Sequence, residues 1–161
     1  MVLPEAFARD FGDPSHPLGP YAEALDGPFA RAVDTLAQRW GTTVVAGMFE
    51  TSDDPERPFN TLLVRGAVEA AYRKIHLYDS FGFRESDRLV AGELTPQVVE
   101  LRGVKLGLMT CYDLRFPELA RRLVDRGPRP SSSPRPGWPA TGRSTTGAPS
   151  CGRVPSRTPC T

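Results

Sequence analysis

The sequence predicts an α/β fold in which β-sheets are layered against helices. The first observation is a segment with helical periodicity at residues 28–40, which is followed by short β-branched strands. The second is an apolar strand at residues 104–109 that runs through a sharp turn into another helical segment. Strands and helices that follow one another along a chain with long connecting loops are typical of layered α/β domains.

The N-terminal third of the chain predicts a strand end, a surface loop and a helix. Residues 1–7 form a short apolar run that meets Pro4 and Glu5, and residues 8–24 are rich in Pro, Gly and Asp. A helix is expected from Pro28 to Trp40, ended by Gly41. Its apolar positions recur on one face and are Phe29, Ala32, Val33, Leu36, Ala37 and Trp40.

The middle of the chain predicts three strands. Residues 42–49, 60–64 and 68–72 are β-branched and apolar, and a turn at Arg65-Gly66 joins the last two. A further hairpin is expected where residues 98–101 turn at Arg102-Gly103.

The strand at residues 104–109 is short and bounded by turn residues, so we expect it to be buried. Cys111 follows it, and Pro117 then begins a helix up to Gly127 whose apolar face is formed by Leu119, Ala120, Leu123 and Val124. The positive end of that helix is expected to favour the thiolate of Cys111. Most lone cysteines are small buried hydrophobes, so the pattern alone leaves a structural role open.

Composition limits the classes of partner. The formal net charge is +1 with no basic stripe, so nucleic acid is not expected as a partner. No apolar stretch approaches 18 residues and no leader is evident, which predicts no membrane partner and a cytoplasmic location. Cys111, Cys151 and Cys160 form no spaced framework, so an oxidising compartment is not implied. His16 and His76 lack paired Cys or acidic spacing, so no metal site is expected, and we expect no cofactor.

Three motifs carry a resemblance to a known family. The run Thr110-Cys111-Tyr112-Asp113-Leu114-Arg115-Phe116-Pro117-Glu118-Leu119 closely resembles the nucleophile motif of the nitrilase superfamily, the carbon-nitrogen hydrolases, and within it the amidase branch that includes omega-amidases. Residues 3–7, with Glu5, are similar to the family's general-base motif, and residues 72–77, with Lys74, to its lysine motif. Taken alone, Glu5 would be a solvated loop acid and Lys74 a solvated amine.

The resemblance implies a Glu-Lys-Cys triad that cleaves small linear amides to carboxylate and ammonia through a thioester. Cys111 would attack the carbonyl, Glu5 would move the proton, and Lys74 with the backbone N–H of Tyr112 would hold the oxyanion. Glu85, in a Glu-Ser pair, would support the lysine and position the substrate. The family also implies a nitrilase-like α-β-β-α sandwich without a cofactor, and homo-oligomers for intact members. His76 is expected to be a packing neighbour.

A change in composition near Gly127 predicts two parts. Five of the 20 basic residues and none of the 19 acidic ones follow it, so residues 1–127 carry a formal charge of −4. Residues 1–127 are interpreted as a partial carbon-nitrogen hydrolase domain, and residues 128–161, rich in Pro, Ser and Arg, as a disordered tail. If Ser131 to Ser133 use TCN codons, the neighbouring frame encodes apolar residues, so we predict that the tail is out of frame through a frameshift or a sequencing error.

The chain itself is therefore expected to be an incomplete sandwich and inactive. One alternative is a non-catalytic remnant or binding module of the same fold. A thiol redox protein is disfavoured because Cys111 has no nearby resolving cysteine, and a papain-like protease because no histidine is placed as a base.

Overall fold

The computed structural model describes residues 1–127. The expectation of a disordered, out-of-frame tail concerns residues 128–161, which lie outside the described part. The boundary at Gly127 stays a prediction.

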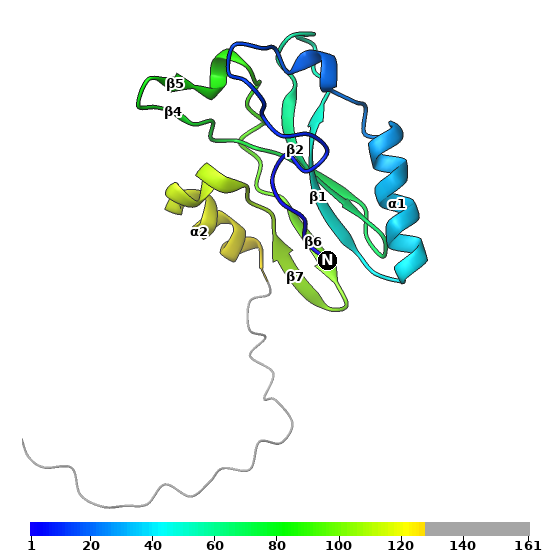
Figure 1. The fold of residues 1–161 in the computed structure, drawn as a ribbon. Coiled ribbons are helices and arrows are strands. Elements are labelled where there is room, and N and C mark those ends of the chain that lie inside the picture. The colour runs from blue at the N-terminus through cyan, green and yellow to red at the C-terminus, as the bar shows by residue number, and fades with distance from the viewer. Residues whose placement is uncertain (128–161) are drawn as a thin grey trace, which may run out of the picture. The chain divides into compact units, whose positions relative to one another are not determined.

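A helix covers one face of a three-stranded sheet (Figure 1). The helix is α1 (Pro28–Trp40), and the antiparallel strands β1 (Val44–Glu50), β2 (Phe59–Arg65) and β3 (Ala70–Arg73) follow in that order across the sheet. The three strands confirm the sequence expectation with shifts of one or two residues at their ends. The first core cluster lies between helix and sheet and contains Ala30, Val33, Ala37, Val44, Ala46, Met48 and Leu63.

The buried face of α1 differs in part from the predicted one. Ala30 is buried, whereas Ala32 is exposed and Trp40 is 64% exposed. Ala30, Val33 and Ala37 are spaced three and four residues apart, so they form one row toward the sheet, and Ala32 and Trp40 lie off that row. Gly41 ends the helix with a positive φ of 58°, as expected of a glycine there.

A second layer packs on the other face of the sheet. It consists of the hairpin β6 (Val98–Leu101) and β7 (Val104–Gly107) and of α2 (Pro117–Arg126). The second core cluster joins both layers through Val64, Tyr72, Ile75, Val99, Leu108, Leu119 and Leu123. Helices α1 and α2 therefore flank the strands, which confirms the helix-strand-strand-helix layering expected of the sandwich (Figure 1).

The prediction of a buried strand at residues 104–109 is wrong. β7 ends at Gly107 and all four of its residues are exposed, with Val104 at 58% and Leu106 at 42%. Within residues 1–127, β7 pairs only with β6, so its outer edge has no strand beside it. Burial starts at Leu108, after the strand has ended. Val124 on α2 is also exposed, contrary to expectation, because only Leu119 and Leu123 face the core.

The N-terminal segment lies along β1. Val2 forms an isolated parallel bridge with Val45, whose carbonyl accepts a hydrogen bond from Leu3 N at 2.8 Å. Next along β1, a Cβ on Gly47 would lie 2.4 Å from the nitrogen of Ala6. Only a residue without a Cβ permits this approach, so Gly47 sets how closely the backbone of Glu5 and Ala6 can lie to the sheet.

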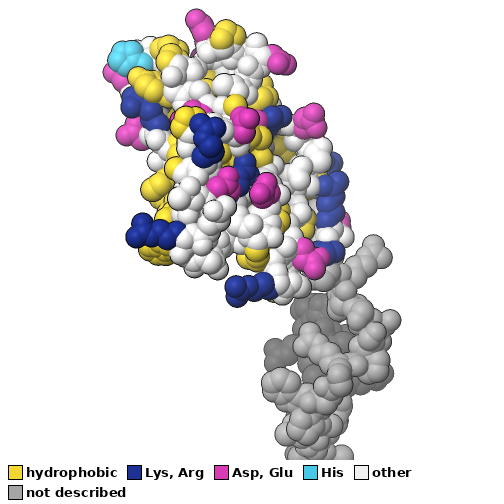
Figure 2. Space-filling model, turned by 90° about the vertical axis from the view of Figure 1, so that its right-hand side faces the viewer, with side chains coloured by type: hydrophobic (Ala, Val, Ile, Leu, Met, Phe, Trp, Pro, Cys, Tyr) yellow, Lys and Arg dark blue, Asp and Glu magenta, His cyan; other side chains and the backbone are white. Residues whose placement is uncertain are grey.

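The surface carries both signs of charge. Figure 2 shows basic and acidic side chains interspersed among apolar atoms on the face that carries α1. Among residues 1–127, no helix combines the length and the apolar character needed to cross a membrane.

Candidate active site

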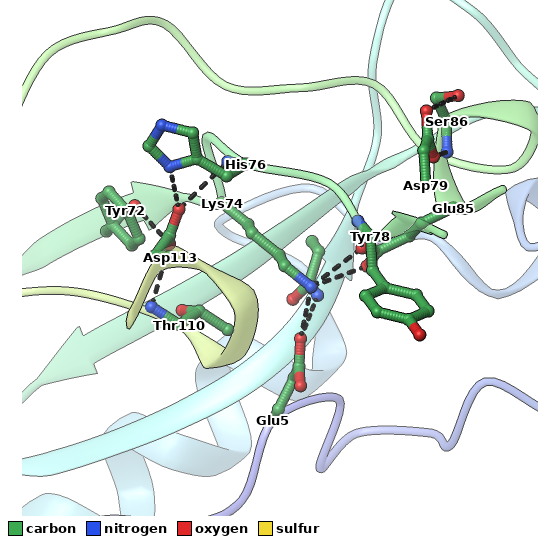
Figure 3. A network of polar contacts seen from close by, with 11 residues as sticks. Glu5, Tyr72, Lys74, His76, Tyr78, Asp79, Glu85, Ser86, Thr110 and Asp113 are labelled. Carbon is green, nitrogen blue, oxygen red and sulfur yellow. Dashed lines mark hydrogen bonds and ion pairs between the residues drawn. The ribbon is translucent and has the colours of Figure 1, made fainter. Parts of the chain in front are cut away.

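Three segments that are far apart in the sequence meet at Lys74. Its side chain is 2% exposed, and its Nζ lies 3.1 Å from Glu5 Oε1 and 2.9 Å from each oxygen of Glu85 (Figure 3). Glu5 comes from the N-terminal segment, Lys74 directly follows β3, and Glu85 begins the 3₁₀ turn Glu85–Asp87. The structure thus brings together three of the residues singled out in the sequence.

The two carboxylates keep the lysine charged. Burial by itself lowers the pKa of Lys74, but the hydrogen bonds and charges of Glu85, and then of Glu5, outweigh it and raise the pKa above the usual value. The backbone of Lys74 is fixed as well, because its N–H donates to Asn60 O and its carbonyl accepts from Gly92 N, both at 2.8 Å. The ammonium group is therefore held in one place.

Glu85 is positioned by the loop that precedes it. Its Oε2 accepts a hydrogen bond from Tyr78 N at 2.6 Å, and its own N–H donates to Tyr78 O at 3.0 Å. Asp79, beside Tyr78, accepts from both the N–H and the hydroxyl of Ser86 (Figure 3). The short strands β4 (Asp79–Ser80) and β5 (Phe83–Arg84) form the hairpin that brings these groups together.

Asn60 is a site residue that the sequence analysis did not single out. It is buried at the start of β2, and its Nδ2 donates to Glu5 Oε1 at 2.7 Å. The signal available in the sequence was a polar amide inside an apolar strand, where a buried polar group requires a partner. Glu5 therefore receives donors from both Asn60 and Lys74 through one oxygen.

Cys111 lies at the start of a 3₁₀ turn, Cys111–Arg115, and is exposed. Its φ of 48° is in the left-handed region, which is uncommon for a residue with a side chain and costs on the order of 1 kcal/mol or more. Partial burial, and then the nearby Glu5 carboxylate, raise the pKa of the Cys111 thiol, while the Lys74 ammonium opposes them.

The expectation that a helix end favours the thiolate is therefore wrong. Helix α2 begins only at Pro117, six residues after Cys111, and the intervening turn is too short to carry a comparable dipole. Burial of the thiol and then the carboxylate of Glu5 raise its pKa instead, so the thiol is kept protonated in the resting site.

An open cavity of about 730 Å³ surrounds the thiol. It is lined by Tyr78, Ser80, Phe81, Cys111, Tyr112, Leu114 and Arg115. Phe81 is 98% exposed, so part of the cavity wall is accessible to solvent. Tyr112, singled out from the sequence, lines this cavity, and its ring lies nearly perpendicular to that of Tyr78 at a centroid distance of 5.0 Å.

Within residues 1–127, no group of three or more His, Cys, Asp or Glu side chains is arranged to hold a metal ion. His76 stacks on Phe116 with ring centroids 3.7 Å apart, and its Nδ1 lies 2.8 Å from Asp113 Oδ1. It is a packing and hydrogen-bonding neighbour, as expected. Asp113 is the second buried polar residue that the sequence analysis passed over.

Comparisons with known proteins show the family of this chain. A family model described as carbon-nitrogen hydrolase matches residues 1–129. A hydrolase of Mycobacterium tuberculosis is 46% identical over 132 residues, which cover 79% of this chain and 45% of that protein. The deaminated glutathione amidase of Escherichia coli O157:H7 is 43% identical over 123 residues, covering 74% of this chain and 46% of that protein. The chain thus spans less than half the length of these relatives.

A solved structure adds chemical information about a neighbour. It is a mutant of the amidase from Nesterenkonia sp. AN1 that shows covalent addition of the acetamide moiety of fluoroacetamide at its active-site cysteine. It superposes with a TM-score of 0.64 at 29% identity and covers 80% of this chain and 48% of that one.

Proposed function

This chain belongs to the carbon-nitrogen hydrolase family, and from that premise we propose that Glu5, Lys74 and Cys111 form a triad that hydrolyses small linear amides. The observation that carries the proposal is the contact of Lys74 Nζ with Glu5 at 3.1 Å and with Glu85 at 2.9 Å, beside a thiol whose pKa is raised by burial and then by Glu5. A buried ammonium between two carboxylates and next to a cysteine matches the needs of acyl transfer.

In the first half of the reaction, the protonated thiol requires a base. Glu5 takes the proton as Cys111 Sγ attacks the amide carbon, and the carbonyl electron pair moves onto the oxygen. Lys74 Nζ and the backbone N–H of Tyr112 stabilise that oxyanion. Glu5 then gives the proton to the nitrogen, the C–N bond breaks, ammonia leaves and a thioester remains.

In the second half, water replaces the amine. Glu5 removes a proton from water as the water oxygen attacks the thioester carbon, and Lys74 again stabilises the oxyanion. The C–S bond then breaks, the thiol regains its proton from Glu5, and the product leaves as a carboxylic acid that releases its proton to solvent. Glu85 keeps Lys74 charged and in place throughout, because it binds Nζ through both oxygens.

The cavity favours substrates with a negatively charged end. Arg115 lines the same cavity as Cys111, and among the described residues it forms no ion pair. A carboxylate at the far end of a linear amide would find a guanidinium there. Intact oligomers and a cytoplasmic location stay predictions.

We further propose that the 161-residue chain is inactive by itself. The cavity around Cys111 is open to water, with Phe81 and Leu114 on its wall 98% and 73% exposed. Water weakens the electrostatic contacts on which an oxyanion site depends. Closure of the cavity would come from the further sequence that longer relatives contain.

The test is a chimera in which residues 1–127 replace the matching segment of the Mycobacterium tuberculosis hydrolase. Ammonia release from small linear amides is expected from the chimera and not from the 161-residue chain. Cys111→Ala should abolish turnover in the chimera, and Glu118→Gln, on the exposed surface of α2, should leave it unchanged. A folded chimera that keeps its turnover after Cys111→Ala would refute the triad. A folded chimera that alkylates readily at Cys111 but never releases ammonia would favour a non-catalytic binding module.

A further inference from the structure

The nucleophile turn and the lysine segment are joined by one buried carboxylate. Asp113 is 0% exposed and accepts four hydrogen bonds (Figure 3). Its Oδ2 accepts from the hydroxyl of Tyr72 at 2.6 Å and from Thr110 N at 3.0 Å. Its Oδ1 accepts from His76 N at 3.0 Å and lies 2.8 Å from His76 Nδ1. Each carboxylate oxygen thus has two hydrogen-bond partners.

These partners lie on either side of Lys74 in the sequence. Tyr72 precedes the lysine by two residues and His76 follows it by two, so Asp113 spans the segment that carries the ammonium group. On the other side, Asp113 is itself two residues after Cys111. A displacement of Asp113 would therefore change the distance between the thiol and the Lys74–Glu5 pair.

Asp113 also closes the turn in which Cys111 has its unusual backbone. Its side chain accepts from Thr110 N, and its own N–H donates to Thr110 O, also at 3.0 Å. Cys111 lies between these two residues with a φ of 48°. Such a conformation persists only where surrounding contacts hold it, and here the same carboxylate supplies one of them.

The partners of Asp113 are themselves fixed. Burial first, and then the hydrogen bond and charge of Asp113, raise the pKa of Tyr72, so the phenol stays a donor over the accessible pH range. The His76 ring is stacked on Phe116 with an interplanar angle of 8°. Because its donors are held rigidly, Asp113 does more than satisfy a buried polar group: it fixes the nucleophile turn to the lysine segment.

We propose that Asp113 is a positioning residue that sets the placement of the Cys111 thiol relative to Glu5 and Lys74. The inference rests on the proposed function only for its catalytic consequence. The placement itself can be measured on the 161-residue chain without turnover.

The experiment uses a background with Cys151→Ser and Cys160→Ser, so that Cys111 is the only thiol. The rate of alkylation by iodoacetamide is measured as a function of pH, and its midpoint reports the pKa of Cys111. The charged groups that act on this thiol are Glu5, Lys74 and Glu85. In Asp113→Asn the amide replaces one acceptor oxygen by a donor, so the turn should loosen and the midpoint should fall toward the ordinary value of about 8.5.

A second variant tests the proposal in case Asp113→Asn does not fold. Tyr72→Phe removes one of the four hydrogen bonds and leaves Asp113 in place, so a smaller fall of the midpoint in the same direction is expected.

Glu5→Gln should lower the midpoint by itself. Asp113→Asn should add little in that background, because the Glu5 charge relative to which Asp113 positions the thiol is gone. In the chimera, Asp113→Asn should lower kcat by about 100-fold with KM nearly unchanged, as expected for a small misplacement of reacting groups.

Two results would overturn the proposal. One is an unchanged midpoint in folded Asp113→Asn or, if that variant does not fold, in folded Tyr72→Phe. The other is an equal fall with and without Glu5. Absence of turnover in every chimera would count against the proposed function. It would not affect the thiol measurements on the 161-residue chain, which test the positioning role separately.

Discussion

Substitution of Glu85 by Gln tests how much the buried lysine depends on its main partner. Lys74 is 2% exposed, and Glu85, at 3% exposed, contacts its Nζ through both oxygens at 2.9 Å. Removal of one member of a buried ion pair typically costs about 3–5 kcal/mol. Glu5 still lies 3.1 Å from Nζ, and the Gln amide oxygen still accepts one bond. These remaining contacts reduce the expected loss in the free energy of unfolding to about 2–3 kcal/mol.

The assay is chemical denaturation of the 161-residue chain at neutral pH, with Glu118→Gln as the matched control. Glu118 pairs with Arg121 at 3.2 Å, and both side chains are about 70% exposed. An exposed pair of this kind contributes at most about 0.5 kcal/mol, so the control should be nearly neutral. In the chimera, Glu85→Gln should also reduce kcat, because the ammonium is less firmly held. Equal stability losses in the two variants would refute the assignment of Glu85 as the partner that holds Lys74.

Three further predictions follow from the same contacts. Gly47→Ala should displace Glu5, since a Cβ there would lie 2.4 Å from Ala6 N, and should therefore lower the alkylation midpoint of Cys111. The control Gly41→Ala should cost about 1 kcal/mol of stability because of the positive φ at that position, and should leave the midpoint unchanged. Asn60→Ala should cost about 1–2 kcal/mol of stability and lower kcat in the chimera, because Glu5 loses the nearer of its two donors, at 2.7 Å, and keeps only Lys74. The pKa of Lys74 is raised in the folded chain, so its stabilising contribution is complete below the unfolded-state pKa of about 10.4 and is lost as pH rises through the folded-state pKa. Alkaline denaturation curves of wild type and Lys74→Met should therefore converge only at high pH.

Local patterns predicted the elements of this fold well because their causes are local. Pro28 and Gly41 bound α1 as the sequence indicated, since a fixed φ suits a first helical residue and a positive φ suits the residue after the last. The turns at Arg65-Gly66 and Arg102-Gly103 were found for the same reason, and both hairpins formed. In contrast, the faces of α1 and α2 were predicted only in part, because periodicity fixes the width of an apolar stripe and not which row meets the sheet.

The site was accessible from sequence only through the resemblance of its motifs. Glu5 and Lys74 are separated by 69 residues, and nothing in the properties of either segment places them 3.1 Å apart. Asn60 and Asp113 were missed because their importance lies in partners that are distant in the sequence, Glu5 for the first and Tyr72 and His76 for the second. Asn60 is a polar residue in an apolar strand and Asp113 stands inside the nucleophile motif, and neither pattern identifies the partner of the side chain.

The exposure of β7 connects the fold to the question of activity. The apolar run at residues 104–109 has the composition of a strand covered on both faces, yet Val104 and Leu106 are exposed and the outer edge of β7 is unpaired within residues 1–127. Cys111 follows this strand by four residues, so an additional strand or layer on β7 would stiffen the support of the nucleophile. If that support is what the isolated chain lacks, the chimera should protect the β7 amides from hydrogen exchange at the same time as it gains turnover. A chimera that gains turnover while its β7 amides exchange as fast as those of the isolated chain would show instead that closure of the cavity alone restores the reaction.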